Sequence, residues 1–171
     1  MRSTALALGA AALATMILRA PCHADDAAVS THRTEHYELH VDGSLDAVEL
    51  GRLLERLHAK LTTYFDAAPA GRLRIEILRD ETQFKQALAD SGEPHEDFGG
   101  YYSPAAKTAW LFVQPSAYFT RHLLLHEATH QFHFLIATGN HAPAAEWYRE
   151  GLADYMGLHT WDGKQLRVGR V

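Results

Sequence analysis

Two histidines and a glutamate lie inside a strongly apolar run, LLLHEATHQFHFL, from Leu123 to Leu135. His126 and His130 are four residues apart, so on a helix their imidazoles share one face, about one turn from each other. Together with Glu127 they form an H-E-x-x-H pattern, which is typical of a divalent metal ion that activates water. Imidazole ligands combined with a carboxylate suit zinc well.

A third ligand must lie downstream, because a catalytic zinc ion takes three protein ligands and keeps a fourth position open. Twelve histidines in 171 residues make a chance H-E-x-x-H match a real risk, so a second signal is needed. Glu150 supplies it after 19 intervening residues, a gap that fits a helix end, a loop and the start of a second helix. Asp154 follows one turn later, where its carboxylate can accept a hydrogen bond from a metal-bound imidazole.

HEATH followed at this distance by WYREGLADY resembles the gluzincin branch of the zinc metallopeptidases, the clan of thermolysin and the aminopeptidases. The second motif of that family reads Trp, two residues, Glu-Gly, one residue, Ala, one residue, Tyr. The matching positions in this chain are Trp147, Glu150, Gly151, Ala153 and Tyr155.

The resemblance implies a zincin-like fold with one zinc ion on His126, His130 and Glu150. It also implies that Glu127 is the general base for hydrolysis of peptide bonds. A peptide or protein would be the substrate, and the KTAWLFV strand would be the sheet edge along which it pairs.

Gluzincins usually continue into a helical C-terminal portion that supplies a tyrosine or histidine to stabilise the oxyanion. Only 17 residues follow Asp154, so we expect residues 25–171 to be a minimal metallopeptidase domain or one that lacks a C-terminal subdomain. Judged by residue type alone, the residue that stabilises the oxyanion could be Tyr101, Tyr102, Tyr155 or His159.

The residues alone leave two other functions open. One is a non-catalytic, metal-stabilised module that binds a peptide or a cell-wall fragment. The other is a metal-dependent hydrolase that acts on a non-peptide bond. The intact Glu127 favours a hydrolase, since a pure binding module has no need of a general base.

Hydrophobic periodicity predicts the elements that position these residues. The site helices are expected from Ser116 to about Thr138 and from Ala144 to about His159, with Trp147 anchoring the second in the core. Upstream elements are strands over 34–42 and 72–79, a helix over 45–65 with Ser44 as N-cap, a short helix opening at Asp80, and two strands joined around 103–107. A last strand follows WDGK. This order predicts a single α+β domain with helices packed on a small mixed sheet.

Residues 1–24 resemble a signal peptide, with Arg2, an apolar run from Ala5 to Leu18, and Cys22 and Ala24 at the positions that a signal peptidase reads. About 14 apolar residues fall short of the roughly 20 needed to span a bilayer. We therefore expect cleavage after Ala24 and an exported protein, periplasmic or secreted, without stable membrane insertion. Cys22 is the only cysteine, so the mature chain would contain no disulfide.

The net charge of the chain is −5. Removal of residues 1–24 takes away two arginines and no acid, which leaves 14 basic against 21 acidic residues and a net charge of −7. This balance argues against nucleic acid as a partner. The sequence does not specify the oligomeric state.

Overall fold

A computed structural model of the chain describes residues 29–42, 44–93, 99–137 and 145–170. These residues form a mixed α+β fold, as the sequence predicts. Its elements, in chain order, are β1 (Ser30–Arg33), β2 (Tyr37–Val41), α1 (Ala47–Phe65), β3 (Leu73–Leu78), α2 (Glu81–Asp90), β4 (Gly100–Ser103), β5 (Thr108–Phe112), α3 (Ala117–Ile136), α4 (Glu146–Gly157), β6 (His159–Trp161) and β7 (Leu166–Val168).

The main sheet has the strand order β1-β2-β3-β5-β4. β2, β3 and β5 run parallel to one another, while β1 and β4 pair antiparallel at the two edges. β5, within KTAWLFV, therefore lies inside the sheet, and the expectation that it forms the edge is wrong. Residues Thr108–Leu111 are all buried, which is typical of a strand covered on both faces. The edge strand is β4.

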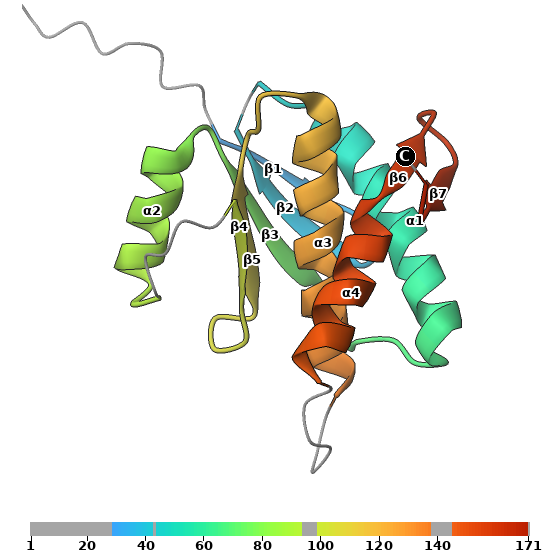
Figure 1. Cartoon of the computed structure of the whole chain (residues 1–171). Helices are drawn as coiled ribbons and strands as arrows, with labels where there is room; N and C mark the ends of the chain where they lie inside the picture. The colour runs from blue at the N-terminus through green and yellow to red at the C-terminus, as the bar shows by residue number, and fades with distance from the viewer. Residues whose placement is uncertain (1–28, 43, 94–98, 138–144, 171) are drawn as a thin grey trace, which may run out of the picture.

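Helices cover both faces of this sheet (Figure 1). On one face, Phe84 and Leu88 of α2 pack against Trp110 of β5. On the other face, α1 and α3 cover the inward side chains of β2, β3 and β5, such as Leu39 and Ile75. Burial of each leucine or isoleucine contributes about 1.5–3 kcal/mol, so this second layer carries most of the core. α4 packs against α3 on the side away from the sheet.

Side-chain hydrogen bonds cap the first turn of α3 and attach the helix to the sheet. The helix is expected from the sequence to begin at Ser116, which is its N-cap, and the Ser116 hydroxyl accepts a hydrogen bond of 3.2 Å from the Phe119 N–H. Further along, the buried Gln131 side chain donates hydrogen bonds of 2.9 and 3.0 Å to the carbonyls of Arg74 and Lys107. Both carbonyls belong to the sheet and its connecting turn, so Gln131 ties α3 to the sheet on the same side as its buried apolar residues, such as Leu124 and Phe132.

Several local predictions need correction. The N-cap of α1 is Asp46 rather than Ser44, because the Asp46 carboxylate reaches the N–H groups of Val48 and Glu49. The chain end forms a separate two-stranded hairpin of β6 and β7 rather than one further strand. Trp147 is 78% exposed and does not anchor α4 in the core. The buried side chains of α4 are instead Leu152, Ala153 and Met156.

Other predictions lie on residues that are not described. The signal peptide at residues 1–24, the cleavage after Ala24 and the lone Cys22 are outside the described residues, as is the predicted start of the second site helix at Ala144. Among the residues that are described, none of the helices combines the length and apolarity of a membrane span.

Candidate metal centre

The packing of α4 on α3 brings His126, His130 and Glu150 together. The two imidazole Nε2 atoms are 3.0 Å apart. Oε2 of Glu150 lies 3.5 Å from Nε2 of His126 and 3.3 Å from Nε2 of His130. Three donor atoms from two helices thus converge on one point, and they form one of two groups in the described chain that could hold a metal ion.

Helical spacing explains this convergence. His126 and His130 are one turn apart on α3, and Glu150 and Asp154 are one turn apart on α4. The buried side of α4 is occupied by Leu152 and Met156, so its acidic face turns toward the imidazoles. Oδ1 of Asp154 lies 3.1 Å from Nδ1 of His126, on the opposite side of that ring from Glu150. Asp154 can therefore fix the orientation of His126, as the sequence predicts.

Burial keeps both imidazoles in the neutral form. It lowers the pKa of His126, although the charges of Asp154 and Glu150 act in the opposite direction. Burial and the neighbouring His126 lower the pKa of His130 to about 4. Neutral imidazoles with free lone pairs are the form that binds metal ions, so at neutral pH both rings are available as ligands.

Glu127 lies in the wall of the same cleft and is only 6% exposed. Burial raises its pKa to about 8, and the charge of Glu150 adds to the effect, while a hydrogen bond with the Tyr102 backbone opposes it. The side chain presses against the edge strand β4. A Cβ atom on Gly100 would lie 2.8 Å from Cγ and 2.9 Å from Oε1 of Glu127, so any larger residue there would force the carboxyl group to shift.

The cleft beside these residues has a volume of about 370 Å³. Tyr101 and Tyr102 of β4 line it, so two of the tyrosines considered for the oxyanion role lie beside Glu127. Tyr155 lines a different pocket. His159 is buried and bonds through Nδ1 to the Gly157 carbonyl at 2.7 Å.

Sequence reasoning did not identify Arg149 or Phe134, and both line the cleft. Arg149 directly precedes Glu150 in the second motif, and Phe134 lies one turn beyond His130. These positions, next to one predicted ligand and one turn from another, could have marked both residues as neighbours of the site.

The second group of potential ligands consists of His122, His126 and Asp154. Nδ1 of His122 is buried and has no hydrogen-bond partner among the described residues. Because this group shares His126 with the first, it extends the same centre along α3. At the other end of α3, His133 stacks on Phe65 at a ring distance of 4.9 Å and so has a packing role.

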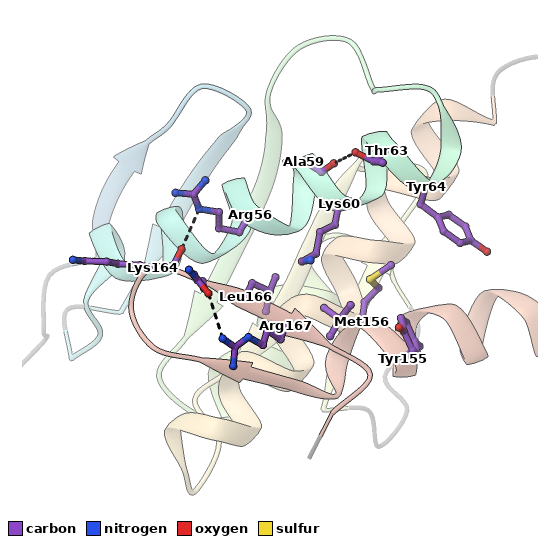
Figure 2. A pocket seen from close by; sticks show the side chains of 12 residues that line it. Arg56, Ala59, Lys60, Thr63, Tyr64, Tyr155, Met156, Lys164, Leu166 and Arg167 are labelled. Atoms are coloured by element: carbon purple, nitrogen blue, oxygen red, sulfur yellow. Dashed lines mark hydrogen bonds between the residues drawn. The ribbon is translucent and has the colours of Figure 1, made fainter.

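A larger groove of about 940 Å³ lies between α1, α4 and β7 (Figure 2). Its apolar floor includes Met156 and Leu166. Among the described residues that line it there is no carboxylate, and four are basic: Arg56, Lys60, Lys164 and Arg167. The potential metal ligands do not extend into this groove.

No known family model and no curated protein matches the chain. The function of the cleft is therefore inferred from its residues and their geometry.

Proposed function

We propose that this protein is a zinc-dependent peptidase of gluzincin type with a zincin-like fold. In this proposal His126, His130 and Glu150 hold one zinc ion, Asp154 orients His126, and Glu127 is the general base. The observation that carries the proposal is the convergence of three donor atoms, 3.0–3.5 Å from one another, beside a buried carboxyl group.

The donor set fits a zinc ion. Zinc binds imidazole nitrogen and carboxylate oxygen at about 2.0–2.2 Å, and tetrahedral geometry then separates neighbouring ligand atoms by about 3.3 Å. The spacing of His126, His130 and Glu150 agrees with that figure. Two neutral imidazoles and one carboxylate also leave one position open for a reacting molecule.

When bound, a zinc ion acts as a Lewis acid that polarises a carbonyl group and makes water more acidic near neutral pH. Glu127 accepts a proton from the attacking water as the new C–O bond forms. It then donates that proton to the amine nitrogen as the C–N bond of the peptide breaks. The hydrolysis needs no covalent intermediate with the protein. The groups of Tyr101 and Tyr102 that line the cleft are the nearest candidates to stabilise the oxyanion.

The buried Glu127 also favours a hydrolase over a metal-stabilised binding module. Burial of a carboxyl group costs free energy, and Glu127 forms no ion pair within the described part of the chain. A binding module gains nothing from that cost. A general base does, because it must face the space in which water and substrate meet, and Glu127 lines the cleft beside His126 and His130.

Export of the protein remains part of the proposal, and it rests on the sequence of residues 1–24 alone. The proposed partners are a peptide or protein substrate, with no nucleic acid and no stable membrane insertion after cleavage. Mass spectrometry of the mature protein should give an N-terminus at Asp25. A mature chain that keeps the Met1 segment would contradict export by this route.

The test combines metal content with peptide hydrolysis. We expect the purified protein to contain one zinc ion per chain and to hydrolyse a mixed peptide library, with activity lost in a chelator. Glu127→Gln should keep the metal and lose activity by about 10²–10⁴-fold, since general acid–base catalysis contributes that much.

Glu146→Gln is the matched control, because it makes the same change at an exposed position in the first turn of α4. This variant should hydrolyse peptides at the normal rate. Normal turnover by Glu127→Gln would remove that residue from the mechanism, and a metal content far below one ion per chain would remove the zinc site.

A further inference from the structure

The side chain of Arg149 occupies the cleft without a polar partner in the described part of the chain. Its guanidinium carbon lies 5.3 Å from the centroid of the Phe134 ring. Its Nε is buried and makes no hydrogen bond. Arg149 lines the cleft together with His130 and Glu127, so an unpaired cation lies within the proposed active site.

The neighbouring carboxylates are committed elsewhere. Glu150 directs Oε2 toward the two imidazoles, at 3.3 and 3.5 Å. Glu127 packs against Gly100 on β4. Neither forms an ion pair with Arg149. The positive charge therefore remains available to a molecule that enters the cleft.

The geometry of the guanidinium group suits a carboxylate. The guanidinium lies over the Phe134 ring, which attracts the cation but offers no hydrogen-bond acceptor to its N–H edge. That edge presents parallel N–H donors, which match the two oxygens of a carboxylate. A buried donor without a partner is unfavourable, so a ligand that supplies an acceptor gains affinity.

We propose that Arg149 is a specificity-determining residue that binds a carboxylate of the peptide at the Phe134 end of the cleft. This proposal rests on the proposed peptidase function and names its substrate class. The carboxylate belongs either to an acidic side chain near the scissile bond or to the C-terminus of the peptide. Both sources present the same two oxygens to the guanidinium.

The experiment measures binding rather than hydrolysis. Fluorescent hexapeptide mixtures are titrated against the inactive Glu127→Gln protein, with zinc and with chelator. One pair of mixtures is amidated at the C-terminus and differs only in a fixed Glu or Gln. The second pair differs only in a free or an amidated C-terminus.

We expect one carboxylate-bearing mixture to bind about ten- to a hundredfold more tightly than its neutral partner, as for a charged hydrogen bond. Preference in the first pair assigns an acidic side chain, and preference in the second pair assigns the C-terminus. Arg149→Gln should remove the preference, and Arg149→Lys should keep part of it because the charge remains. Lys60→Gln, in the separate groove, should leave the preference unchanged.

Equal binding within both pairs would overturn the proposal, as would no binding of any mixture or a preference that survives Arg149→Gln. If Arg149→Gln does not fold, the two peptide pairs and Arg149→Lys still decide the question. Because no step requires turnover, a carboxylate preference without hydrolysis by the wild type would contradict the peptidase proposal and leave the Arg149 site standing.

Discussion

The two sides of α4 border cavities of opposite character. Toward α3, a cleft of about 370 Å³ contains the close-set donors of His126, His130 and Glu150 and the buried Glu127. Toward α1 and β7, a groove of about 940 Å³ presents basic side chains such as Lys60 and Arg167, which are partly or fully exposed (Figure 2). The smaller cavity contains the converging donors, and the larger one does not.

In this protein, therefore, cavity volume does not indicate where the potential metal ligands converge. The largest pocket is the usual first hypothesis for a binding site. Buried titratable groups with shifted pKa values are a more specific sign of a functional site. Burying such a group costs free energy, and active sites are where that cost is commonly found. In the cleft, burial raises the pKa of Glu127 to about 8 and lowers that of His130 to about 4. A carboxyl group and an imidazole thus share one small space with strongly shifted pKa values.

Metal removal should give the largest difference between variants of the cleft and variants of the groove. A chelator should abolish hydrolysis by the wild type and lower the free energy of unfolding, by about 4 kcal/mol if free zinc had been at a thousand times its Kd. His130→Ala should contain little metal and should melt at the same temperature with and without chelator. Lys60→Gln should respond to chelator as the wild type does. A chelator response that persists in His130→Ala would place the ion elsewhere.

The pH dependence of stability should identify the cost of burying Glu127. In the metal-free protein its raised pKa means that the folded chain keeps a proton that the unfolded chain loses. The stability that Glu127 contributes is therefore complete below about pH 4.5 and is lost as the pH rises toward about 8. Glu127→Gln lacks this loss. Between about pH 4.5 and pH 8, the free energy of unfolding of the variant should therefore rise relative to that of the wild type by on the order of 3–4 kcal/mol, as measured by denaturant unfolding at several pH values.

The imidazoles serve as an internal control for that measurement. Burial lowers the pKa of His126 and of His130, so their contribution runs the other way: for His130 it increases as the pH rises from about 4 and is complete above about 6.5. Both proteins contain them, and the difference between the two proteins isolates Glu127. A difference that is constant from pH 4.5 to pH 8 would contradict the assignment.

Gly100→Ala should test the contact between β4 and Glu127. A Cβ atom there would approach Cγ of Glu127 to 2.8 Å, and the carboxyl group would have to move. Displacement of a catalytic group by about 1 Å can reduce the rate on the order of a hundredfold. Steady-state kinetics should show the loss, with metal content unchanged. Gly151→Ala is the matched control, because a Cβ atom there meets no atom within 4 Å.

Neutralising the groove should have the smallest effect. Lys60→Gln and Arg167→Gln change side chains that form no ion pair with a carboxylate among the described residues. We expect changes in the free energy of unfolding within about 0.5 kcal/mol and unchanged kcat/KM on short peptides. A large loss of activity in either variant would show that the two sides of α4 are coupled.

Much of this arrangement was predictable because it follows from helical spacing. The spacing of the two histidines in HEATH places both on one face of α3. The number of residues up to Glu150 is enough for the chain to reverse direction and bring α4 against that face. The prediction failed where long-range packing decides. Trp147 is apolar, but Leu152 and Met156 already fill the buried side of α4, so the indole is exposed.

Strand positions show the same limit. The residues of β1, Ser30–Arg33, are mostly exposed and carry no alternating apolar pattern, so they give no signal as a strand. β4 and β5 were both predicted as strands, but which of them forms the edge depends on pairing with β3. Arg149 could have been noticed because it adjoins Glu150, but its contact with Phe134 could not be predicted. Its proximity to Phe134 depends on how α4 crosses the end of α3.

The two hydrogen bonds of Gln131 to the sheet carbonyls have a consequence for the proposed metal site. Because they tie α3 to the sheet, the imidazole of His130 and that of His126, one turn earlier, would be preorganised before an ion arrives. The conformational entropy lost on binding an ion would then come mainly from Glu150 on α4, whose side chain is half exposed. An incoming cation would meet a rigid nitrogen pair first and recruit the carboxylate second.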